Sequence, residues 1–203
     1  MKHEKIRFRN GHVVIIPHPE CYSDCFTLIK SDYYRRTGKI VSLLYILIRL
    51  LGGPFAGPLI WLRLSQHRGV FYYLARVTYK LASLLYNINI PNITKIGYGL
   101  YIGHGLCIVI NEGTIIGNNV NISQFLNIGT NQKTPAKIAD NVYIDPGVCI
   151  VEDVEIGDSA TIGAGAVVTK DIPANATAVG VPAQVINYDK PGRFTGRRWR
   201  QLP

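Results

Sequence analysis

The stretch Ile96-Gly-Tyr-Gly-Leu-Tyr-Ile102-Gly-His-Gly-Leu-Cys-Ile108 decides the fold, because an aliphatic residue returns at every sixth position. The pattern continues to residue 168 in steps of 6, 6, 8, 6, 6, 10, 6, 6, 6, 6 and 6. Its members are Ile96, Ile102, Ile108, Ile116, Ile122, Ile128, Ile138, Ile144, Ile150, Ile156, Ile162 and Val168. Such a period fits neither an α-helix nor a hairpin strand. Three units make one triangular coil, and stacked coils bury a continuous apolar column. We therefore predict a β-solenoid prism over residues 93–186.

Glycine directly follows six of these twelve aliphatic residues. Glycine tolerates the positive φ angles that tight corners need, and asparagine is the next-best residue there. We therefore expect each aliphatic side chain to point inward from a short strand. We also expect the glycines, together with Asn118, Asn119 and Asn141, to turn the chain at the corners.

Two steps of the repeat are irregular. Two extra residues fall near 111–113, and four extra residues fall within 130–135. Insertions in a rigid scaffold leave it as loops, and such loops often carry function. We predict that residues 130–135 project from the prism.

Residues 23–87 have another pattern, in which Leu, Tyr, Arg and Lys recur at helical spacing. The sequence therefore predicts a helical region ahead of the solenoid. Within Val41–Trp61 only Arg49 is charged, which approaches the length of a membrane-spanning helix. Gly52-Gly53-Pro54 and Gly57-Pro58 should break such a helix twice. We expect a buried helical pair or an oligomer contact, with a peripheral membrane contact and a spanning helix as alternatives.

Basic charge is concentrated at the two ends of the 203-residue chain. Of the formal net charge of +9, residues 1–80 carry +9, residues 81–186 carry −4 and residues 187–203 carry +4. This distribution argues against a nucleic-acid partner for the repeat region. Basic flanks suit an anionic membrane surface, an acidic polymer or the phosphates of a ligand, and a solvated basic face is the plain alternative.

The composition is that of an ordinary globular protein, with 47% hydrophobic and 17% charged residues. The cysteines Cys21, Cys25, Cys107 and Cys149 lack the spacing of a zinc site, and no apolar secretory signal follows the charged first ten residues. We expect reduced thiols in a cytoplasmic protein, and no metal.

Four segments carry a family resemblance. They are Ile96-Gly-Tyr-Gly-Leu-Tyr-Ile-Gly-His104-Gly, Ile116-Gly-Asn-Asn-Val-Asn-Ile-Ser, Ile162-Gly-Ala-Gly-Ala-Val-Val-Thr-Lys-Asp-Ile-Pro173 and Val179-Gly-Val-Pro-Ala-Gln-Val-Ile186. The chain resembles the hexapeptide-repeat acyltransferases, and specifically the serine acetyltransferases and their relatives in surface-polysaccharide gene clusters. Leu28-Ile-Lys-Ser-Asp32 resembles the family's helical domain more weakly. The resemblance implies a mainly β protein: a left-handed parallel β-helix over residues 88–186, after a mostly helical segment 1–87 and before a basic tail 187–203.

The resemblance also implies an activity, acetyl-CoA-dependent O-acetyl transfer to L-serine, which gives O-acetylserine. It implies a homotrimer, or a hexamer of paired trimers, with acetyl-CoA in the groove between neighbouring prisms. The family's catalytic histidine maps onto His104, the only histidine after residue 67. A neutral imidazole can take the proton of a hydroxyl as that hydroxyl attacks a thioester. Backbone amides at a glycine-rich corner can stabilise the oxyanion. A structural histidine packed at a corner is the alternative.

The acceptor site departs from the family's pattern. An aspartate that orients the catalytic histidine is replaced by Asn89, which can fix the ring but offers no charge. The aspartate before the histidine is replaced by Gly103, and a basic-His-Pro loop motif by Lys133-Thr134-Pro135. A serine ammonium needs a carboxylate, and Glu112 is the nearest acidic residue in sequence to His104. A sugar hydroxyl of a surface polysaccharide is therefore the alternative acceptor.

For the co-substrate, the family's small residues beside the pantetheine arm map onto Pro146 and Ala164, with Gly129 and Thr130 at the base of the loop. Turn chemistry alone also accounts for small residues at these positions. The closing motif of the family usually ends in a cation that meets the phosphates of CoA, and here that position is Gln184.

Other cations are candidates for contact with the CoA phosphates. They are Lys170 and the tail residues Arg197, Arg198 and Arg200. Without such a contact we expect a disordered tail.

Two other functions fit the prism less well. A γ-type carbonic anhydrase needs three histidines to hold zinc at a subunit interface, and the repeat region has one. A non-catalytic scaffold or membrane-docked partner is disfavoured by the intact His104 and by the closing Gly180-Val-Pro182.

Overall fold

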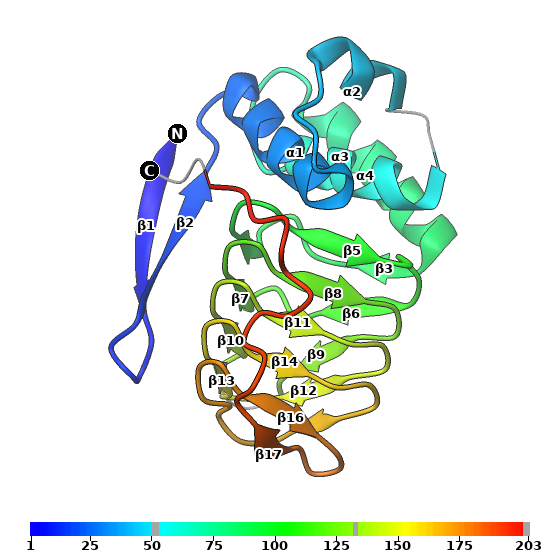
Figure 1. Cartoon of the computed structure of the whole chain (residues 1–203). Coiled ribbons are helices and arrows are strands. Elements are labelled where there is room, and N and C mark those ends of the chain that lie inside the picture. The colour runs from blue at the N-terminus through cyan, green and yellow to red at the C-terminus, as the bar shows by residue number, and fades with distance from the viewer. Residues whose placement is uncertain (50–52, 132–133, 201–203) are drawn as a thin grey trace.

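The computed structural model describes residues 1–49, 53–131 and 134–200. Its body is a tall prism of stacked coils, with helices packed on one end, a two-stranded hairpin along one side and the C-terminal tail along another (Figure 1). The predicted left-handed parallel β-helix is confirmed.

Three sheets form the faces of the prism in the described residues. The hairpin face consists of β4 (Lys95–Ile96), β7 (Ile115–Ile116), β10 (Lys137–Ile138) and β13 (Glu155–Ile156). The tail face consists of β5 (Tyr101–Gly103), β8 (Asn121–Ser123), β11 (Tyr143–Ile144), β14 (Thr161–Ile162), β16 (Thr177–Val179) and β17 (Gln184–Asn187), of which β17 alone is antiparallel to its neighbour. The open face consists of β3 (Ile88–Asn89), β6 (Ile108–Ile110), β9 (Asn127–Gly129), β12 (Cys149–Val151) and β15 (Val167–Val168).

The interior of the prism is the predicted aliphatic column. All twelve aliphatic residues of the repeat are buried, and the most exposed of them, Ile102, is 8% exposed. Residues one coil apart pair in parallel register, as Ile96 does with Ile116 and Ile138 with Ile156. The six-residue period was therefore interpreted correctly, because each unit contributes one inward side chain to the same stack.

The predicted role of the repeat glycines is wrong. None of the six glycines that follow an aliphatic residue has a positive φ. Four of them, Gly97, Gly117, Gly157 and Gly163, lack a side chain because the next coil lies too close: a Cβ on Gly97 would lie 2.6 Å from the backbone of Gly117, and one on Gly157 would lie 2.4 Å from the amide of Ala174. Gly103 and Gly129 have room for a Cβ, with nearest atoms at 3.5 and 3.8 Å. The positive φ angles fall two positions later in the corner, at Gly99 and at the predicted Asn119 and Asn141. Asn118 is not among the residues with a positive φ.

The helices α1 (Tyr22–Thr37), α3 (Gly53–Leu64) and α4 (Tyr72–Tyr86) pack over the first coil, and α2 (Leu43–Arg49) packs on α1 and α3. The predicted break at Gly57-Pro58 is wrong, because Pro58 lies inside α3. The buried side chains of Ile60, Leu62 and Leu64 hold this helix in place despite the missing amide donor. The other predicted break includes Gly52, which lies outside the described residues. No described helix is long and apolar enough to cross a membrane.

A buried ion pair joins these helices to the first coil. Arg63 donates to both carboxylate oxygens of Asp32, at 2.8 and 3.0 Å, and also to the carbonyls of Ile96 and Gly97. Asp32 accepts a hydrogen bond of 2.7 Å from the amide of Leu100. The first coil has no coil before it, so its backbone groups at this end would otherwise lack partners. Asp32 and Arg63 supply them.

The N-terminal segment 1–87, which we expected to be mostly helical, begins with a hairpin of β1 (Lys2–Arg7) and β2 (Val13–His18). We did not predict this hairpin from the sequence. Its β-branched run Val13-Val-Ile-Ile16 favours a strand. Phe8, Val14 and Ile16 are buried in one cluster with Ala139. Arg9 forms ion pairs with Asp153 and Asp171. The hairpin therefore covers the hairpin face, which is the sheet of β4, β7, β10 and β13.

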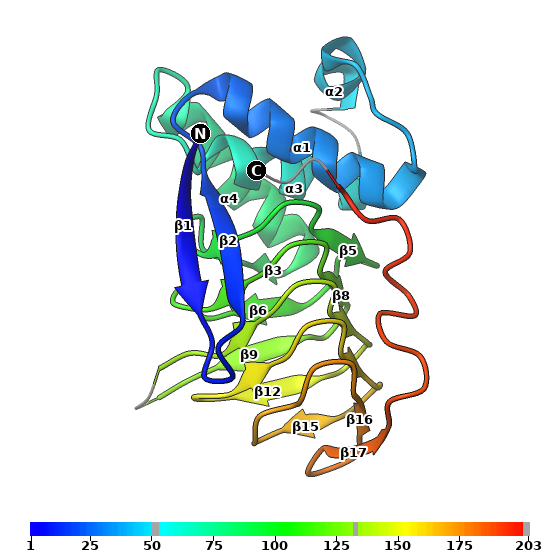
Figure 2. The ribbon, with the colours of Figure 1, turned by 60° about the vertical axis from the view of Figure 1, so that its left-hand side comes forward.

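The tail is ordered over residues 188–200, so the expectation of disorder is wrong. Trp199 is 4% exposed and packs with Leu28 and Tyr98. The amide of Gly192 donates to the carbonyl of Ser159, and Asn121 donates to the carbonyl of Phe194. The tail runs back along the prism from β17 to α1 (Figure 2). One buried aromatic anchor with these hydrogen bonds offsets the entropy of ordering a basic segment.

These additions cover two of the three faces and leave the third uncovered by the described chain. The open face exposes Val109 and Val151 at 44% and 39%. Leu106 and Phe125 at its edge are 44% and 53% exposed.

The predicted loop at 130–135 falls partly on residues 132–133, which lie outside the described residues. Thr134 is exposed, and Pro135 packs closely on Gly113, where an added Cβ would lie 2.8 Å from the Pro135 ring. The two irregularities of the repeat therefore meet at one corner.

We predict that Ile144→Ala lowers the free energy of unfolding by about 2–5 kcal/mol, because it opens a cavity in the aliphatic column. The matched control is Ile93→Ala, at a side chain that is 61% exposed, for which a change within about 0.5 kcal/mol is expected. Urea denaturation at one fixed protein concentration measures both. Equal effects would contradict the assignment of the column as the core.

We predict that Asp32→Asn costs about 3–5 kcal/mol of stability, because it leaves the buried Arg63 without its counter-charge. Asp189→Asn, at an exposed site, is the control. The double change Asp32→Leu with Arg63→Met should cost less than Asp32→Asn alone, since no unpaired charge remains. An unchanged unfolding midpoint for Asp32→Asn would show that the pair does not hold the helices on the coil.

Candidate active site

His104 lies at the corner where the chain passes from β5 on the tail face to β6 on the open face. It is exposed and has a φ of 48°, a left-handed conformation that histidine adopts more readily than most residues. Ile102 and Ile108 on either side are buried in the column. The corner therefore presents the imidazole outward on a rigid support.

Pro146 and Ala164 lie on the same edge of the prism, in later coils. The amide of Gly165 donates to the carbonyl of Pro146 at 2.9 Å, so the two corners are stacked. Coils repeat at about 4.8 Å, so the corners of successive coils form a straight row at this edge. Gln124 and the exposed Phe125 occupy the corner between His104 and Pro146, and the small residues follow in the next two coils. An extended thioester substrate could lie along such a row with its reactive end at the imidazole.

Gly129 and Thr130 lie at the opposite edge of the open face, where β9 ends. They line a hollow of about 280 Å³ together with residues of β12. Lys170 is exposed and follows β15 at the same edge. Gln184 is exposed at the start of β17, on the tail face. The structure thus places most predicted co-substrate residues on the borders of the open face, and Gln184 apart from them.

Asn89 and Glu112 line one hollow of about 340 Å³ between the open face and α4. Asn89 pairs with Val109 across β3 and β6. Arg76 and Lys80 of α4 line the same hollow, and sequence reasoning missed both. Their spacing of four residues on a predicted helix was the available signal, because such residues share a face.

The predicted acceptor residues are not all together within one chain. Gly103 ends β5 beside His104. Glu112 and Thr134 lie at the other edge of the open face, since Pro135 contacts Gly113. Lys133 lies outside the described residues. A site that uses both edges would have to combine two chains.

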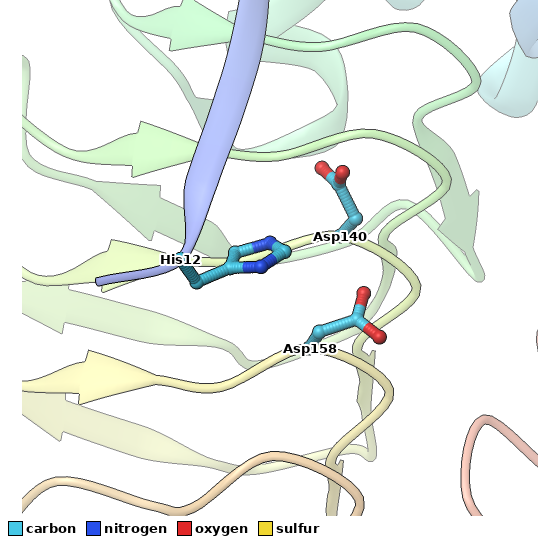
Figure 3. A group of neighbouring side chains, drawn as sticks. All are labelled: His12, Asp140 and Asp158. Atoms are coloured by element: carbon cyan, nitrogen blue, oxygen red, sulfur yellow. The ribbon is translucent and has the colours of Figure 1, made fainter. Parts of the chain in front are cut away.

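A separate cluster, which the sequence did not indicate, joins the hairpin to the prism (Figure 3). His12, Asp140 and Asp158 bring possible metal ligands within 4.8 Å of one another, and His12 Nε2 is buried without a hydrogen-bond partner among the described residues. Carboxylates and imidazole are a suitable set for a divalent cation. The hydrogen bonds that Asn118 donates to Asp140, and that Asn141 and Ser159 donate to Asp158, account for the carboxylates without one.

Burial raises the pKa of Asp140 above its ordinary value, while the hydrogen bonds from Asn118 act in the opposite direction. The cluster lies at the edge between the hairpin face and the tail face, away from the edge with His104. All four cysteines are free thiols, and burial raises the pKa of Cys25 to about 12, which leaves it inert.

Comparison with known proteins supplies the relatives of this chain. Residues 135–170 match the family model described as bacterial transferase hexapeptide (six repeats). The chain is 36% identical over 147 residues to the serine acetyltransferase of Helicobacter pylori strain J99, an alignment that covers 70% of this chain and 86% of the relative.

Two solved structures are similar over most of the chain. A serine acetyltransferase in complex with CoA is 27% identical with a TM-score of 0.64, covering 80% of this chain and 68% of that one. The serine acetyltransferase of Neisseria gonorrhoeae in complex with serine is 28% identical with a TM-score of 0.62, covering 81% and 69%.

Proposed function

Because the chain belongs to the serine acetyltransferase family, we propose that it moves the acetyl group of acetyl-CoA to the hydroxyl of L-serine, with His104 as the general base. It is an acyltransferase, and acetyl-CoA is its co-substrate. The observation that carries this proposal is the single edge of the prism that holds exposed His104 and, beyond the Gln124-Phe125 corner, the stacked small residues Pro146 and Ala164.

The chemistry follows from that edge. A serine hydroxyl is a weak nucleophile until a base takes its proton, and the exposed imidazole of His104 is the proposed base for this step. As the oxygen attacks the thioester carbonyl, the imidazole becomes protonated, and it can then protonate the leaving thiolate. Asn89 is proposed to orient the ring without adding a negative charge.

We infer that the catalytic unit is a homotrimer. The uncovered open face, with exposed Val109, Val151 and Phe125, supports a contact between copies at this face. Such a contact would bring Glu112 and Thr134 of one prism toward His104 of the next and would enclose acetyl-CoA in the groove. A cytoplasmic location agrees with the free thiols.

α4 has an exposed apolar side. Val77, Leu81 and Leu85 on this helix are 59%, 58% and 78% exposed. We propose that paired trimers, as a hexamer, cover this surface, with a peripheral lipid contact as the alternative occupant.

The second candidate function is O-acetylation of a sugar hydroxyl in surface-polysaccharide synthesis. It is favoured by Gly103 and Thr134, which take the places of ionisable residues in the family's amino-acid site. Arg76 and Lys80 in the hollow of Glu112 favour it too, because they compete with a serine ammonium for that carboxylate. Release of free CoA with L-serine and with a panel of sugars distinguishes the two acceptors. The better acceptor is the one with the higher kcat/KM.

We predict that His104→Ala lowers kcat by about 10²–10⁴-fold while the affinity for CoA stays the same, because only the general base is removed. His18→Ala, at a surface histidine paired with Glu4, is the control and should keep full activity. Turnover is followed by thiol release, and CoA affinity by calorimetry. Near-normal turnover of His104→Ala would remove this residue from the mechanism.

We predict that Glu112→Gln costs serine turnover about 2–5 kcal/mol in kcat/KM, with little change in CoA binding, if Glu112 meets the serine ammonium. Glu20→Gln, at an exposed carboxylate that lines neither hollow of the open face, is the control. With a neutral sugar the effect of Glu112→Gln should be smaller, since a hydroxyl needs hydrogen bonds and no counter-charge. If Glu112→Gln acetylates serine as efficiently as the wild type, Glu112 is not the residue that binds the serine ammonium.

A further inference from the structure

A pocket of about 360 Å³ lies between α1, the tail face and the C-terminal tail. Arginine dominates its lining, with Arg35 from α1 and Arg193 and Arg197 from the tail. Tyr101 of β5 and Phe194 of the tail add aromatic surface. No acidic residue is among the lining residues that the structure describes. We call it the arginine pocket.

The charge of the arginine pocket is not balanced by carboxylates. Arg35 donates to the carbonyls of Gly99, Asn119 and Arg197 and to the side-chain oxygen of Asn121. Across residues 1–49, 53–131 and 134–200, neither Arg35, Arg193 nor Arg197 forms an ion pair. Every acceptor of Arg35 is neutral, so its positive charge persists in the pocket.

Nearby acidic groups do not change this balance. Asp32 is the acidic residue whose charge favours the protonated form of Arg35, but its carboxylate accepts hydrogen bonds of 2.8 and 3.0 Å from Arg63. Burial, followed by the positive charge of Arg198, lowers the pKa of Arg35 to about 10. Asp145 interacts with Arg193 at longer range. The sequence adds to the imbalance, because residues 33–111 contain no aspartate or glutamate.

The geometry suits one kind of ligand. Guanidinium groups bind phosphate oxygens through two parallel hydrogen bonds, and several around one cavity can hold adjacent phosphates. The Phe194 ring packs between the Arg193 guanidinium, 4.3 Å from its centre, and the Tyr143 ring, whose centre is 4.6 Å away, and it is still 46% exposed. Its exposed part gives a planar or sugar ring an aromatic and cationic surface to contact. We propose that the arginine pocket binds the diphosphate of a ring-bearing ligand such as a nucleoside diphosphate or a sugar linked to one.

The position of the pocket gives this ligand a role. Tyr101 and Gly103 both face outward from β5, because Ile102 between them is buried. The Cα atoms of Tyr101 and His104 are three residues apart, and so at most about 11 Å apart. A diphosphate-linked acceptor held in the pocket would present its hydroxyls near the imidazole. This consequence rests on the proposed O-acetyl transfer, whereas the binding site itself does not.

Calorimetry on the full-length protein tests the site with inorganic pyrophosphate and with UDP. We expect saturable binding of both that weakens as salt is raised. Arg193→Gln combined with Arg197→Gln should raise the Kd by about tenfold or more, because charge-assisted hydrogen bonds are lost. Both side chains are exposed, so the fold should persist, which thermal unfolding checks.

Two controls make the result specific. Arg7→Gln with Arg68→Gln removes the same charge from exposed sites elsewhere and should leave the Kd unchanged. Phe194→Ala should weaken the binding of UDP and spare that of pyrophosphate, since only UDP has rings to contact the exposed part of Phe194. Absence of saturable binding, or equal Kd values in the pocket variant and its control, would overturn the proposal.

A competition experiment with CoA shows whether the bound diphosphate belongs to the co-substrate or to a separate ligand. If saturating CoA leaves pyrophosphate binding unchanged, the ligand is a separate acceptor or effector. If CoA displaces pyrophosphate in the wild type, the pocket holds the diphosphate of the co-substrate. Binding that survives while acetyl transfer fails with every acceptor would separate this inference from the proposed function.

Discussion

The buried pair of Asp32 and Arg63 is the constraint on which the rest of the structure depends. A solenoid satisfies the backbone of each coil with the next, so its first coil always lacks partners on one side. Here Arg63 and Asp32 bind that coil at Ile96, Gly97 and Leu100 and bind each other without exposure to water. One interaction therefore fixes α1 and α3 relative to the prism, and through the prism it fixes the corner of His104.

The prism could be predicted from the sequence because its rule is local and repeated. Each six-residue unit contains its own inward-pointing aliphatic residue, so the prediction of the prism rested on twelve separate positions. The corner glycines show the limit of this reasoning. Glycine at a turn indicates either a positive φ or a close contact, and only the stacked neighbour, such as Gly117 beneath Gly97, decides between them.

The site could be predicted only in part, for a different reason. His104 was found because its corner belongs to the repeat and to a family pattern. Arg76 and Lys80 share a face of α4, but nothing in the sequence places that face beside Glu112. The arginine pocket combines α1, β5 and the tail, which no period connects. The packing of the hairpin and of the tail on the prism could not be predicted, because each is held by a few long-range contacts, such as that of Trp199 with Leu28.

The antiparallel strand β17 has a consequence for how such a chain can vary. Every other pair on the tail face is parallel, so a further coil would continue the ladder, but β17 occupies the free edge of β16 with its own backbone. The helices block the opposite end. Both ends of the stack are thus closed to growth, which prevents one molecule from polymerising onto another through exposed strands. A longer or shorter relative would have to gain or lose whole coils from the middle, where each new layer finds a matching layer above and below.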